Sequence, residues 1–225
     1  MKSKAVVSIG ILVAGISLLG LTPGAGAQMF GMGAQEVRGV FKPVVGGGAS
    51  YESVKKDGQK TQFDITVVDK DPAGGYWTEI AMTDPRTKDM VYAKSLIAQQ
   101  GDDAVVQRMI VQMPGRPPME MSSMMQGMGH PKQNQKIDIR AEAQDLGTES
   151  ITTPGGTFSC QHWRTTKDGA DVWINEKVTP WGLVKISSKD GTSMTLVKVI
   201  AGAKSHITET PVSMEEMMKG MGKPQ

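Results

Sequence analysis

Two copies of one methionine-rich pattern carry the most distinctive side-chain chemistry in this sequence. Residues 121–131 read M-S-S-M-M-Q-G-M-G-H-P, residues 214–224 read M-E-E-M-M-K-G-M-G-K-P, and a shortened form occupies residues 29–33. Thioether sulfur is a soft ligand that favours Cu(I). The first copy is therefore a candidate copper or silver site, formed by Met121, Met124, Met125, Met128 and His130.

The same spacing supports two other interpretations. In each copy the methionines fall at i, i+3, i+4 and i+7, which is one stripe of an α-helix, and glycine and proline then end the helix. A methionine stripe can pack in a core, or it can form a deformable cover over an apolar ligand. The second copy has Lys223 where the first has His130, which weighs against a repeated metal site.

Cys160 and His162 are the only other pair that could do chemistry. They lie two residues apart on an expected strand and would share a face, as a nucleophile and a base can. No orienting third group or oxyanion hole accompanies them. We expect a buried thiol beside a hydrogen-bonded histidine, no catalytic residue and no enzymatic activity; His206 receives no role.

Strand-length runs with turn sequences between them dominate the rest of the chain. Lys-Asp-Gly occurs at residues 56–58, 167–169 and 189–191, and Asp-Gly favours tight hairpins. Pro118 and Glu120 suit the first turn of a helix. The expected strands are residues 51–54, 63–68, 76–82, 90–97, 105–113, 137–143, 157–165, 172–178, 183–187, 194–200 and 205–209.

These elements predict a mainly β fold in the α+β class. We expect a curled antiparallel sheet, or half-barrel, with the two methionine helices covering its concave face. Trp163 and Trp173 flank one Lys-Asp-Gly turn and are expected near each other across two strands. The side chains expected to line the space between sheet and helices are Met113, Met121, Met124, Met125, Met128, Met214, Met217, Met218 and Met221.

The first residues read as an export signal. Lys2 and Lys4 precede an apolar run at residues 5–21, and the small residues at 25–27 form a cleavage site. The alternative is a membrane anchor, but the run is at the lower limit for a bilayer span. We expect residues 1–27 to be removed, leaving a periplasmic or secreted protein without a stable membrane span.

Charge and cysteine content exclude several classes. Loss of Lys2 and Lys4 lowers Lys plus Arg from 25 to 23, equal to the 23 Asp plus Glu, so the mature chain is nearly neutral and no nucleic-acid partner is expected. Cys160 is the only cysteine, so no internal disulfide can form. We expect a flexible arm at residues 28–48 and one β-rich domain at residues 49–225; the oligomeric state is left open.

Three segments carry a family resemblance. They are T-P-G-G-T-F at residues 153–158, V-W-I at 172–174 and V-T-P-W-G-L-V-K at 178–185. Together they resemble uncharacterised secreted bacterial proteins related to the periplasmic lipoprotein-carrier group. The resemblance implies a half-barrel of antiparallel strands, closed on its open side by helices and holding acyl chains or another apolar guest. It implies no catalytic residue.

The sequence thus favours non-catalytic binding of a hydrophobic, lipid-like guest, with no cofactor. Two alternatives remain. One is soft-metal binding through the first methionine copy. The other is a structural envelope protein whose core is filled by its own side chains.

Overall fold

The structure is a computed structural model that describes residues 39–84, 87–121, 134–136 and 138–213. These residues belong to one compact unit that spans Glu36–Gln225. The predicted signal peptide lies outside the described residues, as do the parts of the two methionine segments that follow Met121 and Ser213. Within the described ranges, no helix is long and apolar enough to cross a membrane.

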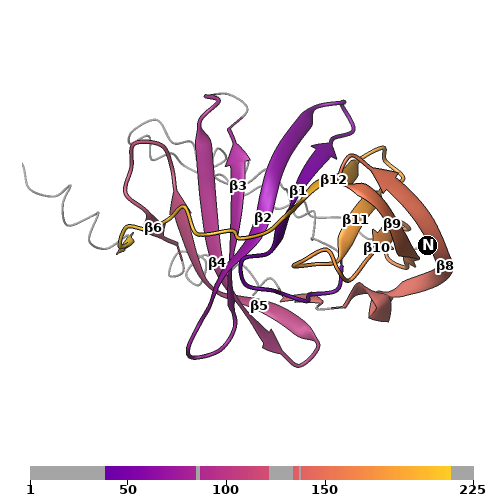
Figure 1. Cartoon of the computed structure of the whole chain (residues 1–225), viewed down its shortest axis with the longest axis horizontal. Helices are drawn as coiled ribbons and strands as arrows, with labels where there is room; N and C mark the ends of the chain where they lie inside the picture. Colours follow the sequence, from indigo (N-terminus) through magenta and orange to yellow (C-terminus); the bar gives the residue numbers. More distant parts are fainter. Residues whose placement is uncertain (1–38, 85–86, 122–133, 137, 214–225) are drawn as a thin grey trace, which may run out of the picture. The chain divides into compact units, whose positions relative to one another are not determined.

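One large sheet makes up the described part of the chain (Figure 1). Its strands run in the order β13-β6-β5-β4-β3-β2-β1-β12-β11-β10-β9-β8, and β7 pairs separately with β5. All pairs are antiparallel except β13 with β6. The strands are β1 Gly48–Val54, β2 Lys60–Lys70, β3 Tyr76–Thr83, β4 Met90–Gln100, β5 Asp103–Gln112, β6 Met119–Glu120, β7 Asn134–Lys136, β8 Ala143–Thr153, β9 Gly156–Thr165, β10 Asp171–Ile174, β11 Leu183–Ser187, β12 Ser193–Ile200 and β13 Val212–Ser213.

The three Lys-Asp-Gly sequences form the hairpin turns predicted for them. Each connects two antiparallel neighbours: β1 with β2, β9 with β10, and β11 with β12. In each turn the aspartate side chain accepts a hydrogen bond from the backbone N–H two residues later, at 3.0 Å for Asp57, 3.3 Å for Asp168 and 2.9 Å for Asp190. The following glycines have φ between 66° and 91°. Local chemistry alone sets these turns.

The sheet is curled at its β8 end but is not closed. The turn between β8 and β9 reaches β12, three strands away in the sheet order, where the Gly155 N–H donates to the Leu196 carbonyl at 3.4 Å. A side chain at Gly155 would approach the Leu196 side chain to 3.0 Å. The outermost strands β8 and β13 do not pair with each other. The prediction of a mainly β fold built on an antiparallel sheet is therefore confirmed. The half-barrel stays a prediction, and the predicted covering helices lie in segments that are not described.

Three local predictions are wrong. Pro118 and Glu120 do not begin a helix: Met119–Glu120 form β6, and the Met121 N–H still donates to the Met109 carbonyl of β5 at 2.8 Å. Residues 139–142 form a 3₁₀ turn, η1 (Ile139–Glu142), because the Asp138 carboxylate caps it by accepting from the Arg140 N–H. The expected strand at residues 205–209 is an irregular segment.

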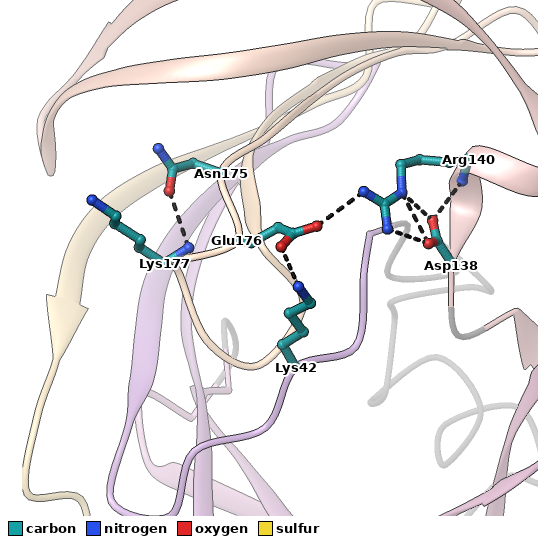
Figure 2. Close-up of polar contacts among 6 residues, drawn as sticks. All are labelled: Lys42, Asp138, Arg140, Asn175, Glu176 and Lys177. Atoms are coloured by element: carbon teal, nitrogen blue, oxygen red, sulfur yellow. Dashed lines mark hydrogen bonds and ion pairs between the residues drawn. The ribbon is translucent and has the colours of Figure 1, made fainter.

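The residues just before β1 are fastened to the loop between β10 and β11. The backbone N–H groups of Val40 and Lys42 donate to the carbonyls of Trp181 and Pro180, at 2.8 and 2.7 Å. Glu176, in the same loop, forms ion pairs with Lys42 and with Arg140 of η1, and Arg140 also pairs with Asp138 (Figure 2). These ion pairs are partly exposed, so each adds little stability by itself.

Candidate ligand-binding face

One face of the sheet is apolar over most of its width. In an antiparallel pair, directly opposed residues share a face. The register therefore aligns one row of side chains across β12, β1, β2, β3 and β4. A second row runs across β2, β3, β4, β5 and β6. The rows consist of Leu196, Tyr51, Phe63, Met82 and Val91, and of Ile65, Ile80, Ala93, Val111 and Met119. We call this surface the apolar face.

The apolar face continues towards β9. Met194 lies two residues from Leu196 and so shares its face. From Met194 the register leads through Ile186 and Val172 to Trp163. Tyr51 is the largest fully buried side chain here, and its hydroxyl donates to the Leu183 carbonyl at 3.1 Å. Burial of that hydroxyl raises the pKa of Tyr51 above its usual range.

The opposite face is closed by a segment that the structure describes. Residues 201–213, which we call the C-terminal strap, run from the end of β12 to β6 and appear in yellow in Figure 1. Ile207 of the strap packs with Trp77, Leu96 and Ile110 of β3, β4 and β5. The strap ends as β13, which pairs with β6. One face of this half of the sheet is thus occupied by the chain's own residues.

A buried carboxylate holds the strap in place. Glu79 of β3 is 1% exposed and lies on the strap side of the sheet. Its oxygens accept hydrogen bonds from the Ser205 hydroxyl at 2.7 Å and the His206 N–H at 3.0 Å, and the His206 ring nitrogen Nδ1 lies 2.6 Å away. The His206 ring also stacks on Tyr92, with centroids 4.6 Å apart. A buried carboxylate is costly unless it is hydrogen-bonded, so Glu79 and the strap depend on each other.

The structure describes two of the nine predicted lining residues. Met113 opens the turn after β5, where its carbonyl accepts from the Arg116 N–H at 3.2 Å, and Met121 extends the β6 pairing. Met121 follows Met119 by two residues and so lies on the side of the apolar face; both Met113 and Met121 are half-buried. The others lie outside the described residues: Met124, Met125, Met128, Met214, Met217, Met218 and Met221.

The Cys160 and His162 pair is arranged for packing. Cys160 is fully buried, and its thiol lies 3.6 Å from the Phe158 carbonyl. Burial, together with the nearby Glu149 carboxylate, raises the pKa of Cys160 to about 11. A thiol that stays protonated is a poor nucleophile. The expected buried thiol beside a hydrogen-bonded histidine is confirmed.

His162 belongs to a charged cluster on the face opposite the apolar one. Its ring nitrogens lie 2.9 Å from Glu149 and 2.9 Å from Asp171, and its ring stacks on Trp173 at 4.5 Å. Burial acts to raise the pKa of Asp171, but hydrogen bonds from His162 and Arg164 outweigh it and hold that pKa below its usual range. Both ring nitrogens of His162 therefore lie against carboxylates.

The expected proximity of Trp163 and Trp173 is wrong in its geometry. Trp163 opposes Val172, whereas Trp173 opposes His162. The two tryptophans are one register position apart, so they lie on opposite faces. Trp163 joins the apolar face, and Trp173 is covered by His162 and by the Lys185 ammonium 5.0 Å from its ring centroid.

The structure leaves the soft-metal alternative as a prediction. Of its five residues, Met124, Met125, Met128 and His130 lie outside the described residues. Among the residues that are described, no group of three or more His, Cys, Asp and Glu side chains could hold a metal ion.

Sequence reasoning missed the contact between Glu79 and His206. The two residues are 127 positions apart, and the pattern around each is that of an ordinary strand or turn. The alternation in β3 gave a usable signal, because Glu79 falls between the apolar residues Trp77 and Ala81 on the same side of the strand. A carboxylate at such a position requires partners from another segment.

Comparisons with known proteins give distant structural matches. No family model matches the sequence, and no curated protein sequence matches it. MucB, solved in complex with MucA(peri), matches with a TM-score of 0.42 and 8% identity over 73% of this chain. A Bacteroides fragilis protein with a YmcC-like fold matches with a TM-score of 0.34 and 14% identity, over 72% of this chain and 99% of its own. The chain spans about half the length of the MucB chain, 53% of which is covered.

We predict that Glu79→Gln loosens the strap. The amide keeps the size of the side chain but loses the charge that accepts three hydrogen bonds, so the free energy of unfolding in urea should fall by about 2 kcal/mol. Hydrogen exchange at the His206 amide should accelerate by more than the loss of global unfolding free energy alone would produce. Glu52→Gln, which removes only the exposed ion pair with Lys60, should cost less than about 1 kcal/mol. Equal effects of the two substitutions would contradict the role given to Glu79.

We predict that Cys160 reacts slowly with Ellman's reagent at pH 8. Burial raises the pKa of Cys160 from 9.0 to about 11, so at pH 8 the thiolate fraction is roughly a hundred times lower in the folded chain than in the unfolded one. The rate should rise as the pH approaches 11. Cys160→Ala gives the zero-signal control. A folded-state rate within tenfold of the rate in guanidinium would show an accessible, ionised thiol instead.

Proposed function

We propose that this chain is a non-catalytic protein of the periplasm or the extracellular space that binds a hydrophobic, lipid-like guest against the apolar face. The observation that carries the proposal is that the C-terminal strap covers only one of the two faces of the sheet. The strap occupies one face, with Ile207 packed among Trp77, Leu96 and Ile110. The other face carries two aligned rows of apolar side chains that span seven strands, from β12 through β1 to β6. All of these side chains are buried except Ile80 and Met119, which are half-buried.

The apolar rows have the chemistry of a wall for an alkyl chain. Sites for apolar small molecules are lined mainly by hydrophobic and aromatic side chains with few polar groups. On this face the register gives tyrosine, phenylalanine, methionine, valine, isoleucine and leucine. Ile80 and Met119 are only half-buried in the middle and at the edge of the rows. These two positions are where contact with a guest is expected.

The methionine segments complete the proposed site. The first segment begins at Met121, on the side of the apolar face. The second begins directly after Ser213 of β13, the strand that pairs with β6. Both segments therefore start beside the same sheet edge. Thioether side chains adapt their shape to varied apolar surfaces, so we assign the covering role to Met121, Met124, Met125 and Met128 together with Met214, Met217, Met218 and Met221.

The test is native mass spectrometry of the full chain isolated from its own envelope fraction, combined with uptake of a fluorescent fatty acid. We expect a co-purifying lipid and saturable uptake. Ile80→Gln places an amide in the apolar face and should weaken uptake roughly tenfold, since an unpartnered buried amide costs about 1 to 3 kcal/mol. Lys94→Gln, on the strap face, should leave uptake within about twofold. Absence of both lipid and uptake would refute the proposal.

A second variant separates this function from soft-metal binding. Replacing Met121, Met124, Met125 and Met128 by leucine keeps an apolar cover but removes the thioether ligands. The proposed function predicts that this variant retains fatty-acid uptake. Cu(I) binding by the wild type that disappears in the variant, without any lipid uptake by either, would establish the metal alternative instead.

A further inference from the structure

A polar groove lies between hairpin turns in the part of the sheet formed by β8 to β12. It has a volume of about 440 Å³ and lies between the β9–β10 turn, the β11–β12 turn and the start of β8. Volumes of this size are common for small-molecule sites, which are usually apolar. This groove is instead lined by polar and charged side chains: Gln144, Arg164, Thr165, Thr166, Lys167, Asp168 and Lys189, with Gly169.

The groove has an excess of positive charge. Three of its lining side chains are basic and one is acidic. The Asp168 carboxylate accepts hydrogen bonds from the Thr165 hydroxyl and, at 3.3 Å, from the Ala170 N–H. Arg164 is paired with Asp171, whereas Lys167 and Lys189 form no ion pair in the part of the chain that the structure describes. Because the whole chain carries a net charge of only +2, this charge is a local feature.

The backbone of one hairpin makes room for a lysine of the other. Lys189 extends across Gly169, and a Cβ at Gly169 would lie 2.6 Å from the Lys189 Nζ atom. Gly169 has a φ of 66°, so its place in the turn also favours glycine. Glycine therefore serves the turn and allows the ammonium group to lie at the groove. Lys189 thus reaches across the neighbouring hairpin to the groove.

From this geometry we infer that the groove binds a phosphate-type anion attached to a polar group, such as a glycerol phosphate. Lys167 and Lys189 supply the unpaired positive charge, Arg164 adds guanidinium N–H donors, and the Gln144 amide offers a neutral donor. Phosphate oxygens favour such charge-assisted hydrogen bonds. A volume of 440 Å³ leaves room for the polar group beside the phosphate. The same chemistry occurs in a soluble glycerol phosphate and in a phospholipid headgroup.

The experiment uses the full chain and two probes. Glycerol 3-phosphate is titrated by isothermal calorimetry, and vesicles of phosphatidylglycerol are compared with vesicles of phosphatidylcholine by co-sedimentation. Binding of glycerol 3-phosphate identifies a soluble ligand, and binding to phosphatidylglycerol alone identifies a headgroup. In either case binding should weaken as salt is raised, because these charges are exposed. No binding in either arm overturns the inference.

Matched variants distinguish the groove from overall charge. The double variant K167Q/K189Q should weaken binding by at least about tenfold, while K167R/K189R, which keeps both charges, should retain most of it. K177Q/K198Q removes two exposed lysines elsewhere and should bind within about twofold of the wild type. An equal loss in K177Q/K198Q would show a general charge effect and overturn the site. Thermal unfolding of each variant verifies that it is folded.

This inference is independent of the proposed function. The lipid-uptake test concerns Ile80 on the apolar face, whereas the anion test concerns Lys167 and Lys189 at the hairpin tips. A loss of anion binding with fatty-acid uptake intact, or the reverse, is therefore interpretable. The two results together would state whether the chain recognises an alkyl chain, a phosphate group or both.

Discussion

The pairing of β1 with β12 is the constraint on which the rest of the structure depends. Strands β1 to β6 form one series of hairpins and β8 to β12 another, and the two series join in the sheet where β1 pairs with β12. Because side chains alternate between faces, a slip of one residue in this pairing would turn the apolar side chains of one series towards the polar side chains of the other. The register Tyr51↔Leu196 instead joins them into one apolar face.

The two faces of the sheet differ in how their apolar side chains are covered. An apolar face must be covered, and on one side the strap supplies Ile207 while Glu79 fixes its position through Ser205 and His206. A carboxylate that is 1% exposed needs these partners, so the strap has a defined place on the sheet. The charges on this side, such as Lys94 and Arg108 over Trp77, also keep the surface polar. The opposite face carries no such charges in its two rows, which is why we assign ligand binding to it.

How far the sequence predicts this fold depends on the range of the interaction. The Lys-Asp-Gly turns are predicted correctly, because the Asp57, Asp168 and Asp190 side chains bond within their own turns. The strap and β6 are not predicted, because each is decided by a partner that is distant in the sequence. The Ser205 hydroxyl and the His206 N–H donate hydrogen bonds to the Glu79 carboxylate. The Pro118 carbonyl accepts a hydrogen bond from the Val212 N–H. Proline and glutamate before a methionine stripe suit a helix start locally, yet pairing on both sides makes the Met119–Glu120 segment a strand.

The candidate site follows the same rule. Alternation along each strand predicts an apolar face, but the register that aligns Phe63 with Met82 and Val91 cannot be read from any one strand. The direct measurement is photo-crosslinking of the full chain with a fatty acid that carries a diazirine near the end of its alkyl chain, followed by peptide mass spectrometry. Our account predicts crosslinks to the apolar face, foremost Ile80 and Met119, and to the methionine segments. Crosslinks confined to the strap face, around Tyr92 and His206, would contradict it.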